Sequence, residues 1–161
     1  MMSLSEPPVV FVDIRVRAPV ERVFQAFVDP AVTTHFWFTK SSGKLEAGKR
    51  VRWDWEMYGV GTDVEVKAIE PNRRILIEWS FPNSNLVEFV FTPRGDGSTQ
   101  VAITNDRFKG DCDAAVAAAI ESMGGFAFVL SGLKAWLEHG LELNLIEDKF
   151  PDKHVPSWSG S

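Results

Sequence analysis

The stretch that decides the fold is DAAVAAAIESMGGFAFVLSGLKAWLEHGL, residues 113–141. Its apolar residues recur every three or four positions, which is the spacing of one face of an α-helix. The members of this apolar stripe are Val116, Ile120, Met123, Phe126, Ala127, Leu130, Leu133, Leu137 and Leu141. The pattern predicts one amphipathic helix of about 28 residues that ends at Gly140 or slightly beyond.

The chain before this helix has a different period, because its apolar residues alternate with polar ones as in half-buried strands. The alternating stretches are residues 9–17, 49–57, 62–70, 74–81, 85–92 and 99–106. Short turns at regular intervals separate the last five, which is typical of an antiparallel meander. Between the first and second stretches, residues 19–28 and 30–36 have helical spacing, and Asp29-Pro30 is a helix start signal.

A sheet with one apolar face needs a cover, and the long helix is the predicted element of sufficient length. We therefore expect an α+β architecture, in which a curved antiparallel sheet of about six or seven strands wraps round the C-terminal helix. Two short helices follow the first strand. A curved sheet and a straight helix do not fit together everywhere, which predicts a cavity between them. The expected organisation is a flexible N-terminus at 1–8, one domain at 9–145 and an irregular tail at 146–161.

Composition and charge exclude several classes of function. The net charge of −5 argues against a nucleic-acid partner or an anionic membrane surface. The first residues show no secretory signal, and no stretch is expected to approach the ~20 apolar residues of a membrane span. We therefore expect a cytoplasmic protein with no membrane span.

Residue types that usually carry out chemistry are sparse. His35, His139 and His154 lack the spacing of metal ligands, so no metal site is expected. Cys112 lies between two aspartates that disfavour its thiolate form, and a single cysteine excludes an intramolecular disulfide. No phosphate-loop or dinucleotide motif is present, so no cofactor is expected and no catalytic residue is assigned. His35 and Asp106 lie at element ends near an expected pocket mouth, where either is a candidate general acid or base.

Aromatic residues are frequent, with twelve Phe, six Trp and one Tyr. Such side chains fill cores, but they also line pockets for apolar ligands. The candidate pocket-lining residues are Trp37, Trp53, Trp55, Met57, Trp79, Phe81, Phe89, Met123, Phe126 and Leu130. Plain core packing is the alternative for most of them. The inward face of the strand at 85–92 stays open, because both of its faces carry apolar residues.

Three glycines and the tail leave further alternatives. Gly124, Gly125 and Gly132 each cost the helix about 1 kcal/mol relative to alanine. Either the helix closely approaches its neighbours there, or a ligand occupies the space. The apolar residues of 141–146 suit a cover over the pocket mouth or a contact with a second copy of the chain, that is, a homodimer. Trp158 is a further lid or interface candidate, or part of a disordered end.

Four short stretches, taken in order, resemble those of a known superfamily. They are APVERVF (18–24), FWF (36–38), IEPNRRILIEW (69–79) and GFAFVLSGLKAWLEHG (125–140). Over about residues 9–140 the chain resembles the START-related helix-grip superfamily, also called SRPBCC. Within it, the chain is similar to the homologues of the activator of the heat-shock-protein-90 ATPase. The resemblance implies a pocket for apolar or aromatic small molecules between helix and sheet, and some related proteins are cyclases, dehydratases or resistance proteins.

We therefore expect binding of a small apolar or aromatic molecule in that cavity, without a cofactor. A first alternative is a cyclase- or dehydratase-like enzyme using the same cavity, which requires an inward titratable group with a perturbed pKa. A second alternative is a chaperone-interacting or other protein-interaction module, which requires an exposed apolar patch of several hundred Å².

Overall fold

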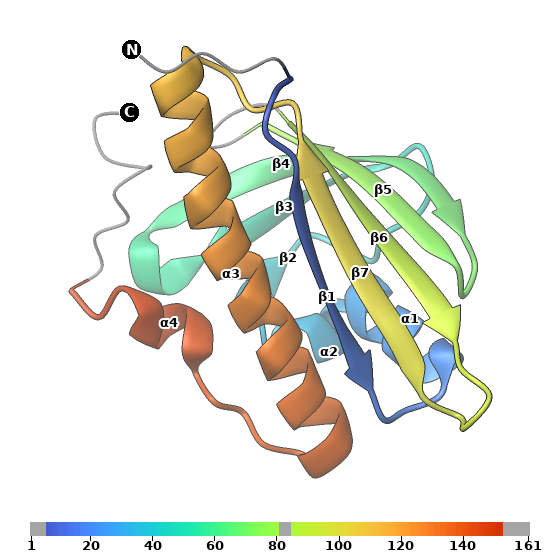
Figure 1. Cartoon of the computed structure of the whole chain (residues 1–161). Coiled ribbons are helices and arrows are strands. Elements are labelled where there is room, and N and C mark those ends of the chain that lie inside the picture. Colours follow the sequence, from blue (N-terminus) through green and yellow to red (C-terminus); the bar gives the residue numbers. More distant parts are fainter. Residues whose placement is uncertain (1–5, 81–84, 153–161) are drawn as a thin grey trace.

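A long helix, α3 (Cys112–His139), lies along one face of a curved antiparallel sheet in the computed structural model (Figure 1). The structure describes residues 6–80 and 85–152. The strands of this part are β1 (Val10–Val16), β2 (Lys40–Ser41), β3 (Arg50–Trp55), β4 (Val60–Glu70), β5 (Arg74–Trp79), β6 (Asn85–Pro93) and β7 (Thr99–Asp106). They form a sheet of seven strands in the order β1-β7-β6-β5-β4-β3-β2 within the described residues. The expected α+β helix-grip fold is confirmed.

The chain crosses from one edge of the sheet to the other before the meander begins. Helices α1 (Val20–Val28) and α2 (Pro30–Thr33) connect β1 to β2 at the opposite edge, and the meander returns until β7 pairs with β1. Asp29 caps the N-terminus of α2, as the sequence predicts: its carboxylate accepts a hydrogen bond from the Ala31 N–H at 3.0 Å. This crossing places the loop after α2 beside the inner face of the sheet.

Cross-strand register decides which face of β6 points inward. Phe89 lies opposite Ile75 on β5 and Ile103 on β7, and all three side chains are buried. Leu86 and Val90, on the other face, stay partly exposed. The neighbouring strands therefore select the Val87-Phe89-Phe91 face, which the sequence pattern left open.

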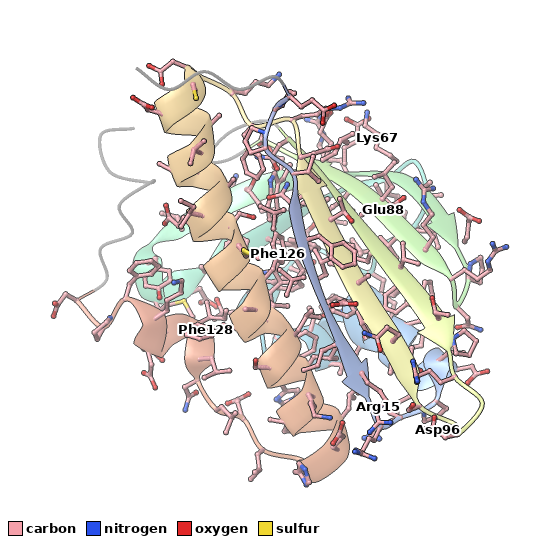
Figure 2. All side chains as sticks on the ribbon, viewed as in Figure 1. Arg15, Lys67, Glu88, Asp96, Phe126 and Phe128 are labelled. Carbon is pink, nitrogen blue, oxygen red and sulfur yellow. The ribbon has the colours of Figure 1, made fainter. Side chains whose placement is uncertain are left out.

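Ion pairs cover the outer face of the sheet. Lys67 on β4 lies 3.6 Å from the Glu78 carboxylate on β5, and Glu88 on β6 accepts a hydrogen bond from Arg74 at 2.5 Å. Near the end of β1, Arg15 reaches Asp96 at 3.5 Å (Figure 2). Since these groups are solvated, each pair contributes about 0–1 kcal/mol, and the main effect is to keep this face polar.

Three elements differ from the sequence pattern. Strand β3 ends at Trp55, and a short 3₁₀ turn, η1 (Glu56–Tyr58), takes Met57 out of the strand face. Strand β2 is too short to show an alternation. Helix α4 (Leu145–Lys149) forms where an irregular tail was expected, because Gly140 ends α3 in the left-handed region (φ 67°) and the chain folds back beside it. The predictions for Phe81, His154 and Trp158 lie outside the described residues.

Within the predicted stripe, the buried members are Phe126, Leu130, Leu133 and Leu137 of α3. Phe126, Leu130 and Leu133 are at most 4% exposed, whereas Ile120 is 69% and Met123 is 52% exposed. By length and mean hydropathy (1.6 over its most apolar window) α3 is apolar enough to span a membrane, so the expectation about composition was wrong. A single helix of this kind is weak evidence for a span, because helices that pack on a sheet can have the same composition.

Hydrogen bonds to the Glu138 carboxylate connect the C-terminal half of α3 to the end of β1. This carboxylate accepts hydrogen bonds from the Arg17 backbone N–H at 2.8 Å and from Lys134 Nζ at 2.5 Å. The side chain is 8% exposed. Desolvation by burial acts to raise the pKa of Glu138, but the hydrogen bonds from Arg17 and Lys134 outweigh it, so this pKa lies below its ordinary value of 4.5.

Replacing the Glu138 carboxylate tests whether its hydrogen bonds stabilise the fold. Glu138→Gln should lower the free energy of unfolding by about 1–2 kcal/mol at pH 7, because Lys134 and the Arg17 N–H lose a charged acceptor. Folding lowers the pKa of Glu138, so its contribution is present above the unfolded-state pKa and is lost as the pH falls through the folded-state value. In urea denaturation, the difference in free energy of unfolding between Glu138→Gln and the unmodified chain should therefore be smaller at pH 3 than at pH 7. Glu21→Gln, at an exposed position, is the control. An equal difference for Glu138→Gln at both pH values would show that the charge of Glu138 does not stabilise the fold.

Candidate functional site

The indole of Trp37 is the centre of an aromatic cluster between the sheet and α3. It is 6% exposed, and its ring centroid lies 4.9–6.5 Å from those of its aromatic neighbours. These neighbours are Phe27, Phe38, Trp53, Trp55, Trp79, Phe89 and Phe126. Tilted and edge-on geometries, which aromatic pairs prefer, predominate around Trp37. Six of the candidate residues, counting Trp37, thus come together here.

Local contacts of the loop after α2 hold Trp37 in place. The Thr33 hydroxyl donates a hydrogen bond to the Ala26 carbonyl at 2.6 Å, which anchors the end of α2 to α1. Phe36 then packs against Gly132 of α3, where an added Cβ would lie 3.0 Å from the Phe36 Cβ. The close approach of Phe36 to α3 therefore explains why residue 132 is a glycine. At Gly125 an added Cβ would meet no described atom within 4 Å, so close packing does not explain that one.

A pocket of about 240 Å³ adjoins the cluster and shares Trp37 with it. It is lined by residues 34–37, Thr39, Met57, Gly132 and residues 142–147. The loop after α2 thus contributes to both the aromatic cluster and the pocket. The sequence analysis placed Met57 in the lining on the basis of a strand face, whereas the structure brings it there on η1.

Residues 141–149, which we call the strap, cover this pocket. The Tyr58 hydroxyl donates a hydrogen bond to the Ile146 carbonyl. His35 Nδ1 lies 2.9 Å from a Glu142 carboxylate oxygen, and the imidazole stacks on Trp136 with a centroid distance of 3.8 Å. At the other end of the strap, Lys149 Nζ lies 5.3 Å from the ring of Phe128, on the α4 side of α3 (Figure 2). The strap is therefore fastened along its length to η1, α2 and α3.

Acidic side chains make the environment of the strap electronegative. Burial raises the pKa of the Tyr58 phenol, a backbone hydrogen bond with Phe150 counteracts this, and the charges of Glu147 and Asp148 raise the pKa further. Glu142 and Glu147 also line the pocket.

The remaining candidate residues lie elsewhere. Leu130 is buried in the core, on the helix face that carries Phe126, and Met123 is exposed on α3 away from the pocket lining. Of the two acid or base candidates, His35 lines the pocket and Asp106 does not. In the described part of the chain, no group of three or more His, Cys, Asp or Glu side chains could hold a metal ion.

A buried hydrogen-bond network, which the sequence analysis did not assign, orients another ring of the cluster. Asn105 donates to the Asn85 side-chain oxygen at 2.8 Å and to the Leu86 carbonyl at 2.7 Å, and it accepts from the Ser122 hydroxyl at 2.6 Å. Asn85 also accepts from the Trp79 indole N–H at 2.5 Å. Trp79 stacks on Phe126 at 5.8 Å. In the sequence, the signal for this network was an asparagine, Asn105, at a position of β7 that faces the interior.

The family model of the activator of Hsp90 ATPase homolog 1-like proteins matches residues 17–138. The chain belongs to this family. The match extends from the end of β1 to Glu138 of α3, and so includes Trp37, the Asn105 network and the inner face of the sheet. The strap follows the matched region.

Solved structures have the same fold as this Hsp90-ATPase-activator-like chain. Protein SSP2350 from Staphylococcus saprophyticus is 29% identical with a TM-score of 0.73, over 84% of this chain and 96% of that protein. DynU16, described as a protein in the dynemicin biosynthetic locus, is 25% identical with a TM-score of 0.71, over 83% of this chain and 48% of DynU16. The Aha1 dimer from Colwellia psychrerythraea is 20% identical with a TM-score of 0.70, over 83% and 98%. A search of curated proteins gave no match.

Removing the amide of the buried network should destabilise this family member. Asn105→Ala removes the buried hydrogen bonds that Asn85 and Ser122 make with this amide, which should lower the free energy of unfolding by about 2 kcal/mol. Urea denaturation followed by circular dichroism measures this loss. Thr104→Ala, on the outer face of the same strand, is the matched control and should change stability by less than about 0.5 kcal/mol. Equal losses in the two variants would show that the network does not stabilise the fold.

Proposed function

We propose that the chain binds a small apolar or aromatic molecule in the pocket beneath the strap. The observation that carries this proposal is the pocket itself, which Trp37 lines together with residues of the strap. A volume of about 240 Å³ is below the 300–1,000 Å³ usual for drug-sized ligands. It exceeds the roughly 150 Å³ that accommodates benzene in an engineered cavity. The size therefore favours a ligand with one ring and a short chain.

The pocket differs from the cavity that the sequence analysis expected. Trp37 occupies part of the space between the sheet and α3, and the proposed site lies next to this ring, under the strap. In the described part of the chain, the buried polar residues are Thr33, Thr62, Asn85, Ser98, Thr99 and Asn105. These side chains do not titrate near neutral pH, so the enzyme alternative depends on His35 and Glu142 at the pocket. Binding without chemistry is the function that this arrangement supports best.

Two further expectations belong to this proposal. DynU16 is described as part of a biosynthetic locus, and likeness to it is in keeping with a role in handling small molecules, although the chain spans about half of its length. A cytoplasmic location agrees with the ion-paired outer face of the sheet. A homodimer stays a prediction, and the Aha1 protein from Colwellia psychrerythraea, described as a dimer, has the same fold.

Filling the pocket from the strap tests the proposal without disturbing Trp37. A library of one-ring compounds is screened by ligand-observed NMR against the full chain. Leu143→Trp places a large side chain at a pocket-lining position that is 44% exposed, and should weaken any pocket ligand at least about tenfold.

The matched control is Leu141→Trp, because Leu141 is on the strap and exposed but does not line the pocket. Ligands of the proposed site should bind this variant as they bind the unmodified chain. If every ligand found binds the two variants equally well, or if no compound binds, the pocket is not the site of a small-molecule function.

A further inference from the structure

Two carboxylates are among the groups that line the pocket beneath the strap. Glu142 and Glu147 line it, and the other titratable lining residue is His35, whose ring contacts Glu142. No lysine or arginine is present among the lining residues that the structure describes. The Glu142 side chain is 48% exposed, so its carboxylate has access to both the solvent and the pocket mouth.

The neighbouring cations have partners away from these two carboxylates. Lys149 Nζ lies 5.3 and 5.0 Å from the ring centroids of Phe128 and Phe150 and close to Gly124, about two helical turns from the pocket-lining Gly132. Lys44, on the segment before β3, pairs with Asp29 at 3.9 Å. Neither of these two ammonium groups is placed to neutralise Glu142 and Glu147.

An aromatic wall beside carboxylates is a combination that recognises ammonium groups. An aromatic ring packs favourably against an aromatic side chain, and carboxylates accept charge-assisted hydrogen bonds from N–H donors. Trp37 supplies the indole, and Glu142 and Glu147 supply the carboxylates, all lining the same pocket.

We propose that the ligand of this pocket is a small arylalkylamine in its protonated form, with its ring against Trp37 and its ammonium group at the Glu142–Glu147 rim. This inference rests on the proposed function and names the chemical class of its ligand. The pocket volume admits one aromatic ring with a two-carbon chain, which brings the amine from the wall towards the rim. An anionic ligand of the same shape would meet like charge there, and a neutral ligand would gain no charged hydrogen bond.

Three probes of nearly equal shape test the sign of the recognised charge. They are 2-phenylethylamine, 2-phenylethanol and phenylacetate, and their binding to the full chain is measured at pH 7 and low salt by calorimetry and ligand-observed NMR. The amine should bind at least about tenfold more tightly than the alcohol, and phenylacetate should be the weakest. Leu143→Trp should weaken both the amine and the alcohol, which places them in the pocket.

Charge-removing variants test the rim itself. Glu142→Gln and Glu147→Gln should each weaken the amine about fivefold or more and leave the alcohol unchanged. Asp148→Asn removes one negative charge from α4, the helix that carries Glu147, at a position outside the lining, and should change the affinity for the amine less than about twofold. Circular dichroism and thermal unfolding verify that all variants fold.

The outcomes separate this inference from the proposed function. If the alcohol or phenylacetate binds as tightly as the amine and Leu143→Trp abolishes binding, the pocket function stands and the amine inference is overturned. The inference is equally overturned if the amine binds but the two glutamate variants match Asp148→Asn, or if the library yields only neutral or anionic pocket ligands. If no probe or library compound is sensitive to Leu143→Trp, the proposed function itself fails.

Discussion

The burial of the Trp37 indole between the sheet and α3 is the constraint on which the arrangement of the site depends. Neither the sheet nor the long helix supplies this ring, which comes from the loop after α2. Fully burying a large apolar side chain contributes about 2–3 kcal/mol, and its edge-on neighbours add to this. The loop must therefore come close to α3, and Gly132 permits this approach because Phe36 occupies the space of a side chain there.

The two sides of this loop have different chemical characters. Towards the sheet, Trp37 meets aromatic rings, and the polar groups nearby are amides and hydroxyls that satisfy one another. Towards the strap, the loop borders the pocket, whose lining includes Glu142 and Glu147. Helix α4 has no fully buried residue, so the strap is held by discrete contacts such as Tyr58 to Ile146. Segments held by discrete contacts open at a lower free energy than a packed core.

Membership of the family accounts for the sheet, α3 and the aromatic interior, but not for the ligand. A shared fold accommodates many functions, and the chemistry of a site depends on the side chains that line it. In this chain the acidic residues of the proposed site are on the strap, beyond the part that the family model matches. The charge preference that we propose for this pocket therefore depends on residues outside the family match, and not on the shared fold.

The sequence by itself determined the long helix, the alternating strands and their order along the chain, because apolar periodicity follows directly from backbone geometry. Its resemblance to a known superfamily then predicted the helix-grip fold. The sequence also identified Trp37, Trp53, Trp79, Phe89 and Phe126 as a set. Only the tertiary structure decided which apolar faces are covered: Ile120 continues the stripe of Leu130 but faces solvent, and β6 turns Phe89 inward because of its strand partners. The pocket, too, is a tertiary feature, since it forms only where the reversal at Gly140 brings the strap onto the loop after α2. Periodicity reports which residues share a face, whereas burial depends on what lies opposite that face.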